Sequence, residues 1–247
     1  MTGIAAHKVV VRRGAAVLLD GLSLSTGATG SVAVIGRNGA GKSTLLKVLA
    51  GIERPASGEV RIGDSELGAL SGQERARTLG FLPQHFKPHW DLSVADLVQL
   101  GAARSGRTSQ DSVKHAFGTY ELAGLEHRRW STLSGGERAR VLLATVLVVD
   151  PPILLADEPA ASLDIRHRLD VARALAARGK DRLSLVVMHD LEVAFRFFNR
   201  IVLIVGGRIV ADSRPSELIN DPRLDDAFGV TFDRISTAQG WILRPVN

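Results

Sequence analysis

The stretch with the clearest chemistry is residues 36–44, whose residue types and spacing are those of a phosphate-binding loop. It fits the pattern G-x-x-x-x-G-K-[ST] and lies between a β-branched run, 32–35, and helix-forming residues, 45–50. Glycines let the backbone curl until its N–H groups point inward, and the following helix adds its positive N-terminal end. Lys42 would meet the outer phosphates, and the Ser43 hydroxyl a magnesium ion. The alternative is a glycine-rich turn that binds nothing. The residues expected to contact a nucleotide here are Gly36, Asn38, Gly39, Gly41, Lys42, Ser43 and Thr44.

Two carboxylates follow a second apolar run, residues 153–156. A buried strand that ends in Asp157 places this carboxylate at the carboxyl edge of a parallel sheet, where such folds bind ligands. There Asp157 can hold magnesium, usually through water, and Glu158 can polarise the water that attacks a γ-phosphate. The alternative is that the two acidic residues only begin a turn before Pro159.

Residues 133–137, Leu-Ser-Gly-Gly-Glu, precede a long helix and predict a second anion-binding site besides the phosphate loop. We call the phosphate loop the first anion cradle and residues 134–136 the second. Ser134, Gly135 and Gly136 offer a hydroxyl and backbone amides, to which the helix adds its dipole. One chain rarely needs two cradles for one nucleotide, so we expect this one to serve a nucleotide held by a second copy. The alternative is a serine that only caps its helix.

The order of these motifs resembles that of ATP-binding cassette (ABC) ATPases along essentially the whole chain. The motifs that carry the resemblance are the phosphate loop, Gln84 after a short strand, residues 133–137, Asp157-Glu158, Ser162-Leu163-Asp164 and His189. The resemblance implies that Gln84 joins the magnesium site to a helical lobe and a membrane partner. It implies that Ser134 and Gly136 contact the γ-phosphate of ATP on the opposite subunit, and that Asp164 lies across the dimer seam. It also implies that His189 holds the γ-phosphate and the attacking water; taken alone, His189 could be a surface histidine before a helix.

The site implied in this way has catalytic residues, metal ligands and one departure from the family pattern. Its catalytic residues are Glu158, His189 and Lys42, and its magnesium ligands are Ser43, Gln84 and Asp157. The family usually carries an aromatic residue that stacks on adenine, and here Arg13 occupies the matching place. A guanidinium can lie flat on a purine, so Arg13 is the candidate for that contact.

Residues 81–84 and 91–101, with the ending Phe228-Gly229-Val230, are similar to the ATPases of importers for iron–siderophores, haem and cobalamin. The resemblance implies a head-to-tail dimer around ATP and Mg²⁺, a polytopic permease and a solute-binding protein. It implies a peripheral location on the cytoplasmic side of the inner membrane. The partners, not this subunit, would recognise the solute.

The pattern of apolar runs predicts an α/β fold of the phosphate-loop NTPase (RecA-like) type. Unalternating strands between helices imply a mostly parallel sheet covered on both faces. Short strands within 8–34 predict an antiparallel β subdomain, and residues 201–205 and 208–211 predict a hairpin. Helices without strands predict an inserted lobe at about 85–149, with helices at 94–100, closed by Gly101, and at 112–122, joined by a loop at 105–109. We expect one domain, 1–247, with its core at 1–84 and 150–247.

Composition limits the remaining possibilities. The 247 residues carry a net charge of +5 and no cysteine, which excludes disulfides and thiolate metal sites. The basic residues are scattered and aromatic residues are only 5% of the chain, so no nucleic-acid partner is expected. No run reaches the roughly 20 apolar residues that a membrane span needs. Residues 1–11 lack the n-region and h-region of a signal peptide, so none is expected. The alternative function is a non-transport ABC ATPase that acts on nucleic acid or as an assembly or regulatory factor.

Overall fold

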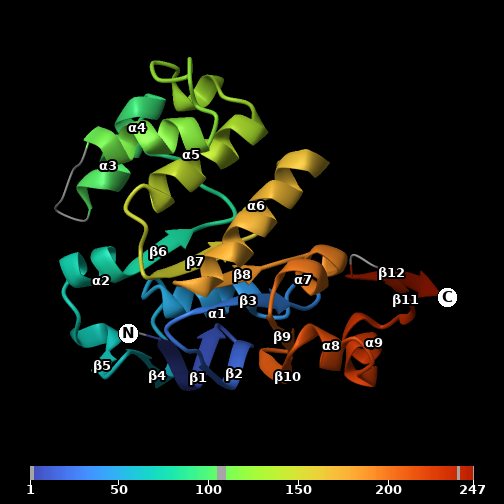
Figure 1. Ribbon diagram of the computed structural model, residues 1–247. Helices are drawn as coiled ribbons and strands as arrows, with labels where there is room; N and C mark the ends of the chain where they lie inside the picture. The colour runs from blue at the N-terminus through green and yellow to red at the C-terminus, as the bar shows by residue number, and fades with distance from the viewer. Residues whose placement is uncertain (1–2, 105–109, 238–239, 247) are drawn as a thin grey trace.

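The computed structural model describes residues 3–104, 110–237 and 240–246, and arranges them as a core and a helical lobe (Figure 1). The core is built on a six-stranded sheet in which five strands run parallel. The strands, in spatial order, are β10 (Arg208–Ser213), β9 (Arg200–Val205), β3 (Gly30–Ile35), β8 (Leu183–Val187), β7 (Ile153–Asp157) and β6 (Leu79–Leu82). Strand β10 returns antiparallel to β9, as the hairpin prediction required. The mostly parallel sheet is thus confirmed.

A second sheet forms the antiparallel subdomain at the bottom of Figure 1. Its strands, in spatial order, are β2 (Ala16–Ser25), β1 (Ile4–Arg13), β4 (Ser57–Ile62) and β5 (Ser65–Glu66). The predicted strands at 8–34 began too late, because β1 starts at Ile4. Strand β3 follows β2 in sequence but pairs with β8 and β9, so the chain changes sheets just before the phosphate loop.

Helices of the core cover both faces of the parallel sheet. They are α1 (Lys42–Leu49), α2 (Gly72–Thr78), α6 (Ile165–Ala177), α7 (Leu191–Phe197), α8 (Pro215–Leu218) and α9 (Pro222–Phe228). Alternate residues of β3 show the two packed faces. Val32 and Val34 pack with α1 and the antiparallel sheet, while Ala33 and Ile35 pack with α6 and α7. Both faces are buried, which explains why the strands read as unbroken apolar runs.

The helical lobe consists of α3 (Val94–Ala103), α4 (Gln110–Thr119) and α5 (Gly135–Leu147). The three helices pack around a cluster of their own that contains Leu97, Ala116, Trp130 and Val141. The loop predicted at 105–109 lies outside the described residues. Helix α4 ends three residues before the predicted 122, since Glu121 leaves the helical region with a φ of 51°.

Gly101 does not end its helix, so that prediction was wrong. Helix α3 continues to Ala103, and Gly101 is buried against α5. A Cβ atom at Gly101 would lie 2.1 Å from the carbonyl oxygen of Thr145. The glycine is therefore needed for the close approach of two helix backbones, and its helical conformation requires no left-handed φ.

The chain ends in a two-stranded sheet that the sequence pattern did not predict. Strands β11 (Thr231–Thr237) and β12 (Gly240–Val246) pair antiparallel and lie beside α7. The backbone N–H of Leu243 donates to Glu192 Oε1 of α7 at 3.3 Å. Phe232 and Leu243 are buried in the core, while most other residues of the two strands are exposed.

Candidate functional site

The phosphate loop connects β3 to α1, as expected, and its glycines have conformations that few other residues could adopt. Gly36 has a φ of 147° and Gly41 a φ of 106°. A Cβ atom at Gly36 would lie 2.3 Å from the Ile204 carbonyl oxygen, and one at Gly41 would lie 2.7 Å from that of Leu18. Neighbouring strands β9 and β2 thus press on the loop from outside. The loop is curled by glycine at positions where a side chain would clash with backbone.

Lys42 folds back over the loop that precedes it. Its Nζ atom donates to the carbonyl oxygens of Gly36 at 2.7 Å and Arg37 at 3.0 Å, and the residue is 5% exposed. Burial lowers the pKa of Lys42, and the nearby charges of Glu158 and Asp157 act against that shift. The ammonium is therefore held at the mouth of the loop, next to the two carboxylates that follow β7.

Asp157 and Ser43 form a pair that fits a magnesium ion. Asp157 is 2% exposed, and burial raises its pKa, while a hydrogen bond from Ser43 opposes that rise. Within the described part of the chain, Asp157 Oδ1 is buried and has no hydrogen-bond partner. A buried carboxylate oxygen without a partner, beside a hydroxyl, matches the hard oxygen ligands that Mg²⁺ prefers. Ser43 and Asp157 would hold the ion, with Gln84 as the third candidate.

Glu158 is bonded through both of its carboxylate oxygens. Gln84 Nε2 donates to Glu158 Oε2 at 2.8 Å, and His189 Nε2 lies 2.5 Å from Glu158 Oε1. These residues follow three neighbouring strands, β6, β7 and β8, whose carboxyl ends meet at one edge of the sheet. The structure thus brings together Gln84, Glu158 and His189, three residues predicted from separate parts of the sequence.

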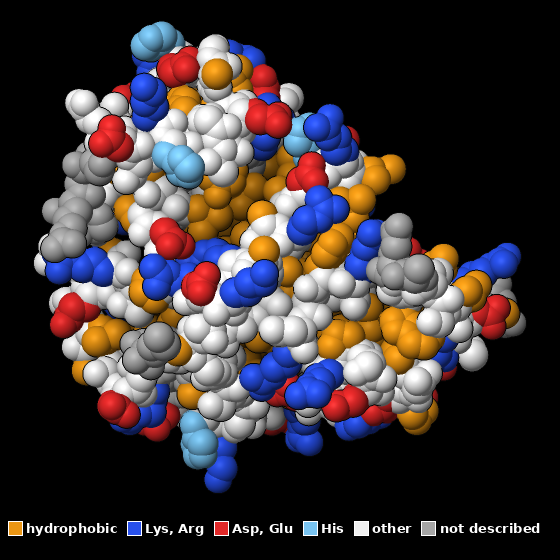
Figure 2. All heavy atoms as spheres, in the orientation of Figure 1, with side chains coloured by type: hydrophobic (Ala, Val, Ile, Leu, Met, Phe, Trp, Pro, Cys, Tyr) orange, Lys and Arg blue, Asp and Glu red, His pale blue; other side chains and the backbone are white. Residues whose placement is uncertain are grey.

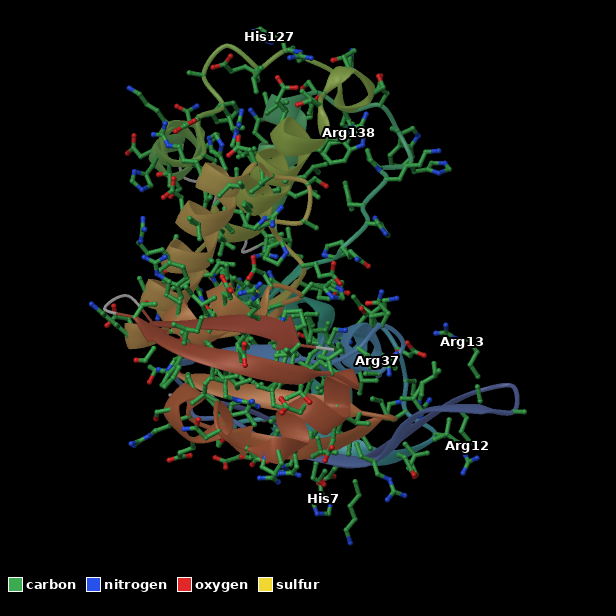
Figure 3. The ribbon with its side chains drawn as sticks, turned by 90° about the vertical axis from the view of Figure 1, so that its right-hand side faces the viewer. His7, Arg12, Arg13, Arg37, His127 and Arg138 are labelled. Carbon is green, nitrogen blue, oxygen red and sulfur yellow. The ribbon has the colours of Figure 1, made fainter. Side chains whose placement is uncertain are left out.

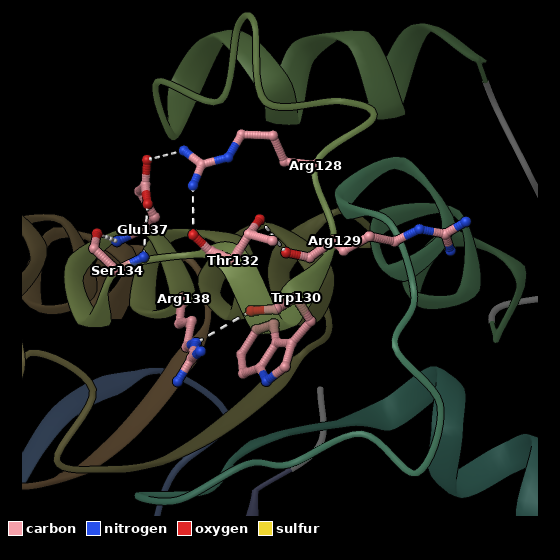
Figure 4. Close-up of polar contacts among 7 residues, drawn as sticks. All are labelled: Arg128, Arg129, Trp130, Thr132, Ser134, Glu137 and Arg138. Carbon is pink, nitrogen blue, oxygen red and sulfur yellow. Dashed lines mark hydrogen bonds and ion pairs between the residues drawn. The ribbon is translucent and has the colours of Figure 1, made fainter.

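The second anion cradle lies at the start of α5, in the lobe (Figure 4). Ser134 caps the helix in a reciprocal arrangement with Glu137: the Ser134 N–H donates to Glu137 Oε2 at 2.7 Å, and the Glu137 N–H donates to Ser134 Oγ at 3.3 Å. The serine hydroxyl accepts a bond in the cap and keeps its own proton for another acceptor. Ser134 caps the helix and uses its own amide in the cap, while its hydroxyl proton and the amides of Gly135 and Gly136, in the first turn, remain available for an anion.

Arg128 fixes the far side of this cradle, which sequence reasoning missed. Its guanidinium donates to Glu137 Oε1 at 2.8 Å and to the Thr132 carbonyl oxygen at 2.5 Å (Figure 4). The Ser134 bonds and Arg128 together lower the pKa of Glu137. The Glu137 carboxylate therefore has a charged partner beside the cradle. Arg128 and Glu137 are nine positions apart, so no helical or strand spacing in the sequence pointed to the pair.

Two further candidates lie at some distance from the phosphate loop. Asp164 caps α6, and the segment before it packs on the second cradle, with Ser162 Cβ 3.5 Å from the Cβ position of Gly135. Arg13 lies near the turn between β1 and β2 and forms an ion pair with Glu53 at 3.2 Å. Figure 3 shows Arg13 and Arg12 on opposite sides of this hairpin. The adenine contact of Arg13 stays a prediction, as do Asn38 and Thr44, which lie on the loop and in α1.

The fold and this edge of the sheet define a phosphate-loop NTPase. Residues 19–161 match the ABC transporter family. The chain is 38% identical over 237 residues to the "Hemin import ATP-binding protein HmuV" of Bradyrhizobium diazoefficiens, covering 92% of this chain and 88% of that protein. A protein of the same name from Thermobifida fusca is 38% identical, with coverage of 90% and 81%.

Solved structures give the same result. The dimeric post-hydrolysis state of an ATP-binding cassette bound to ADP and phosphate superposes with a TM-score of 0.78 at 26% identity, covering 86% of this chain and 98% of that one. A metal-chelate type ABC transporter in an inward-facing conformation shares the fold, with a TM-score of 0.80 at 21% identity over 100% and 97% of the chains.

The chain belongs to the ABC transporter family and is an ATP-binding, ATP-hydrolysing subunit. Across the described ranges, no helix has the length and apolar character that crossing a bilayer requires.

Proposed function

We propose that this chain is the ATP-hydrolysing subunit of a haem importer and acts on the cytoplasmic side of a membrane. The observation that carries the proposal is the 35–38% identity, along most of the chain, to several proteins named for hemin import. The same names disfavour a non-transport ABC ATPase that acts on nucleic acid. Iron–siderophore and cobalamin importers are the related alternatives that a transport assay must separate.

In the mechanism proposed here, ATP binds with its phosphates in the loop 36–44. Lys42 would exchange its bonds to the Gly36 and Arg37 carbonyls for bonds to the outer phosphates. Magnesium held by Ser43 and Asp157 would neutralise charge on the β- and γ-phosphates. Glu158 would orient the attacking water, and His189 would bind the γ-phosphate.

The second cradle is proposed to complete the site of a second copy. Its hydrogen-bonding groups lie in the helical lobe at the head of α5, whereas Lys42 and Ser43 lie in the core at the head of α1 (Figure 1). Similar cassettes have been solved as dimers, which supports the arrangement. In such a dimer Ser134 and Gly136 would bind the γ-phosphate on the partner, and Asp164 would lie at the seam. When the dimer closes around ATP, Gln84 would transmit the conformational change to the helical lobe, and the lobe would transmit it to a permease.

Reconstitution with the permease and the solute-binding protein tests the assignment. We expect ATP-dependent uptake of haemin into proteoliposomes, and no uptake when this chain carries Glu158→Gln. The same vesicles should fail to accumulate a ferric siderophore or cobalamin. Uptake of either of these solutes in place of haemin would reject the haem assignment but leave the ATPase intact.

A further inference from the structure

Helix α6 and the helical lobe face each other across a cavity of about 760 Å³. Figure 2 shows apolar side chains gathered in the hollow between the lobe and α6. At the edge of this cavity, His167 of α6 meets Glu121, which follows α4. His167 also contacts Asp164, the residue that caps α6. One imidazole therefore lies between a carboxylate of the core and a carboxylate of the lobe.

The contact between His167 and Asp164 fixes the proton on one ring nitrogen. The backbone N–H of His167 donates to Asp164 Oδ1 at 3.0 Å, and His167 Nδ1 lies 2.7 Å from Asp164 Oδ2. A carboxylate only accepts, so Nδ1 carries the proton and donates it to Asp164. The ring is oriented by this bond, and its other nitrogen, Nε2, is directed to the lobe.

The carboxylate of Glu121 lies where it can accept a hydrogen bond from Nε2, and the side chain of this residue is 68% exposed. Its backbone has a φ of 51°, in the left-handed region that non-glycine residues rarely occupy. The preceding residue, Tyr120, packs against apolar residues of both the core and the lobe, and burial raises its pKa to about 12. His167 Nε2 lies 3.5 Å from Glu121 Oε2. This pair attracts only when Nε2 also carries a proton, because a bare lone pair would face a carboxylate.

We propose that His167 is a positioning residue that, as an imidazolium, ties the carboxylate of Asp164 in the core to Glu121 at the end of α4 in the lobe. The orientation of the lobe and the placement of Asp164 are then coupled through one side chain. The consequence for hydrolysis rests on the proposed function, in which Asp164 lies at the dimer seam. The bridge itself is formed by three residues of one chain, so its existence does not depend on the dimer.

The pKa of His167 agrees with this arrangement, since the hydrogen bond to Asp164 and the charges of Asp164 and Glu121 raise it. The other charged or titratable groups that line the cavity are Asp111, His115, Arg140, Asp150, Asp170 and Arg178. Two of these acidic groups are already paired, Asp150 with Arg178 and Asp170 with Arg173. As pH rises through the pKa of His167, Nε2 loses its proton and the link to Glu121 is lost, while the bond to Asp164 remains.

The bridge is tested first by NMR titration of the histidine rings in the nucleotide-free chain. We expect Glu121→Gln and Asp164→Asn each to lower the pKa of His167. The control is His115→Gln, a change in a second histidine of the same cavity whose ring bonds to Thr119 of its own helix. It should leave the pKa of His167 unchanged. An unchanged pKa in Glu121→Gln would overturn the proposal whether or not the protein transports haem.

The effect on hydrolysis is measured in the reconstituted transporter as a function of pH. His167→Asn keeps a donor near the Nδ1 position and removes the one that faces Glu121. We expect His167→Asn and Glu121→Gln to lower ATPase activity about two- to fivefold near pH 6, the range expected for one exposed ion pair. The loss should disappear at a pH well above the pKa of His167 measured in the NMR titration, where the wild-type link is also broken. A loss of equal size at both pH values would mean a merely structural role and would reject the coupling, as would no loss at either.

Discussion

The two anion cradles of this chain are built in opposite ways. The phosphate loop is enclosed: its glycines are pressed by backbone from β9 and β2, and its lysine is 5% exposed and bonded to the loop itself. The cradle at the head of α5 is open, and side chains at its surface, Glu137 and Arg128, hold it in shape. The first is complete within one chain. The second presents its groups outward and fits a ligand that arrives on another surface.

The largest effect is expected at the enclosed site. Glu158→Gln keeps the shape of the side chain but removes the charge that polarises water. We expect turnover to fall about 10³-fold, within the range for loss of a general base, while ATP binding stays near the wild-type level. Phosphate release and nucleotide affinity measured on the same sample check this. Normal hydrolysis by the variant would remove Glu158 from the catalytic role.

A pair of glycine substitutions tests the difference between the cradles directly. In Gly36→Ala the new methyl group meets the Ile204 carbonyl, in a φ region that disfavours side chains, so we expect a stability loss of about 3 kcal/mol. In Gly136→Ala the nearest atom is Leu163 Cδ2 at 3.8 Å, so folding should be unaffected. ATPase activity of Gly136→Ala should nevertheless fall about 10²-fold, since the methyl group would block a partner's phosphate. Melting curves and ATPase assays distinguish the two, and full activity in Gly136→Ala would contradict the role of the open cradle.

A smaller effect is expected from the side chain that supports the open cradle. Arg128→Ala removes the bonds to Glu137 and to the Thr132 carbonyl, and we expect a two- to fivefold loss of ATPase activity at subsaturating ATP. The matched control is Arg129→Ala, because the Arg129 guanidinium points away from the cradle and bonds to the Asp91 carbonyl (Figure 4). Equal losses in both variants would show that Arg128 has no special part in the cradle.

The smallest expected effect is on the stability of the folded, nucleotide-free chain when a residue of the enclosed site is changed. Burial raises the pKa of Asp157, so the folded chain holds that proton more tightly than the unfolded chain. Stability due to this group is therefore present below the ordinary carboxyl pKa and decreases as pH rises through the raised value. Asp157→Asn should raise the melting temperature by a few degrees near pH 7, and the gain should vanish at about pH 4. The control variant is Asp233→Asn, at an exposed position of β11; a parallel change in both variants would contradict the argument.

Much of the enclosed site could be predicted from the sequence, because local spacing determines it. The strand, the glycines, Lys42 and Ser43 are contiguous, and Asp157 and Glu158 directly follow a recognisable buried strand. Gln84 and His189 each follow a neighbouring strand, so the topology of a parallel sheet brings them to the same edge. These features depend on backbone periodicity, which a single sequence displays.

The residues that were missed depend on contacts between distant parts of the chain. Arg128 meets Glu137 only because the segment 129–134 folds back on α5, and His167 meets Glu121 only because the lobe lies over α6. Gly101 was assigned to a helix end because its contact with Thr145 has no sequence signal. The C-terminal strands were missed for another reason: most of their residues are exposed, and they gave little apolar alternation.

The contact at Gly101 has a mechanical consequence. With no side chain between them, the backbones of α3 and α5 touch, and a shared apolar cluster fills the space on either side. Because the two helices form one rigid unit, we expect a displacement of α3 to move α5 by a similar amount. Ser134, at the N-terminal end of α5, would move with it. A single methyl group at position 101 would loosen that joint.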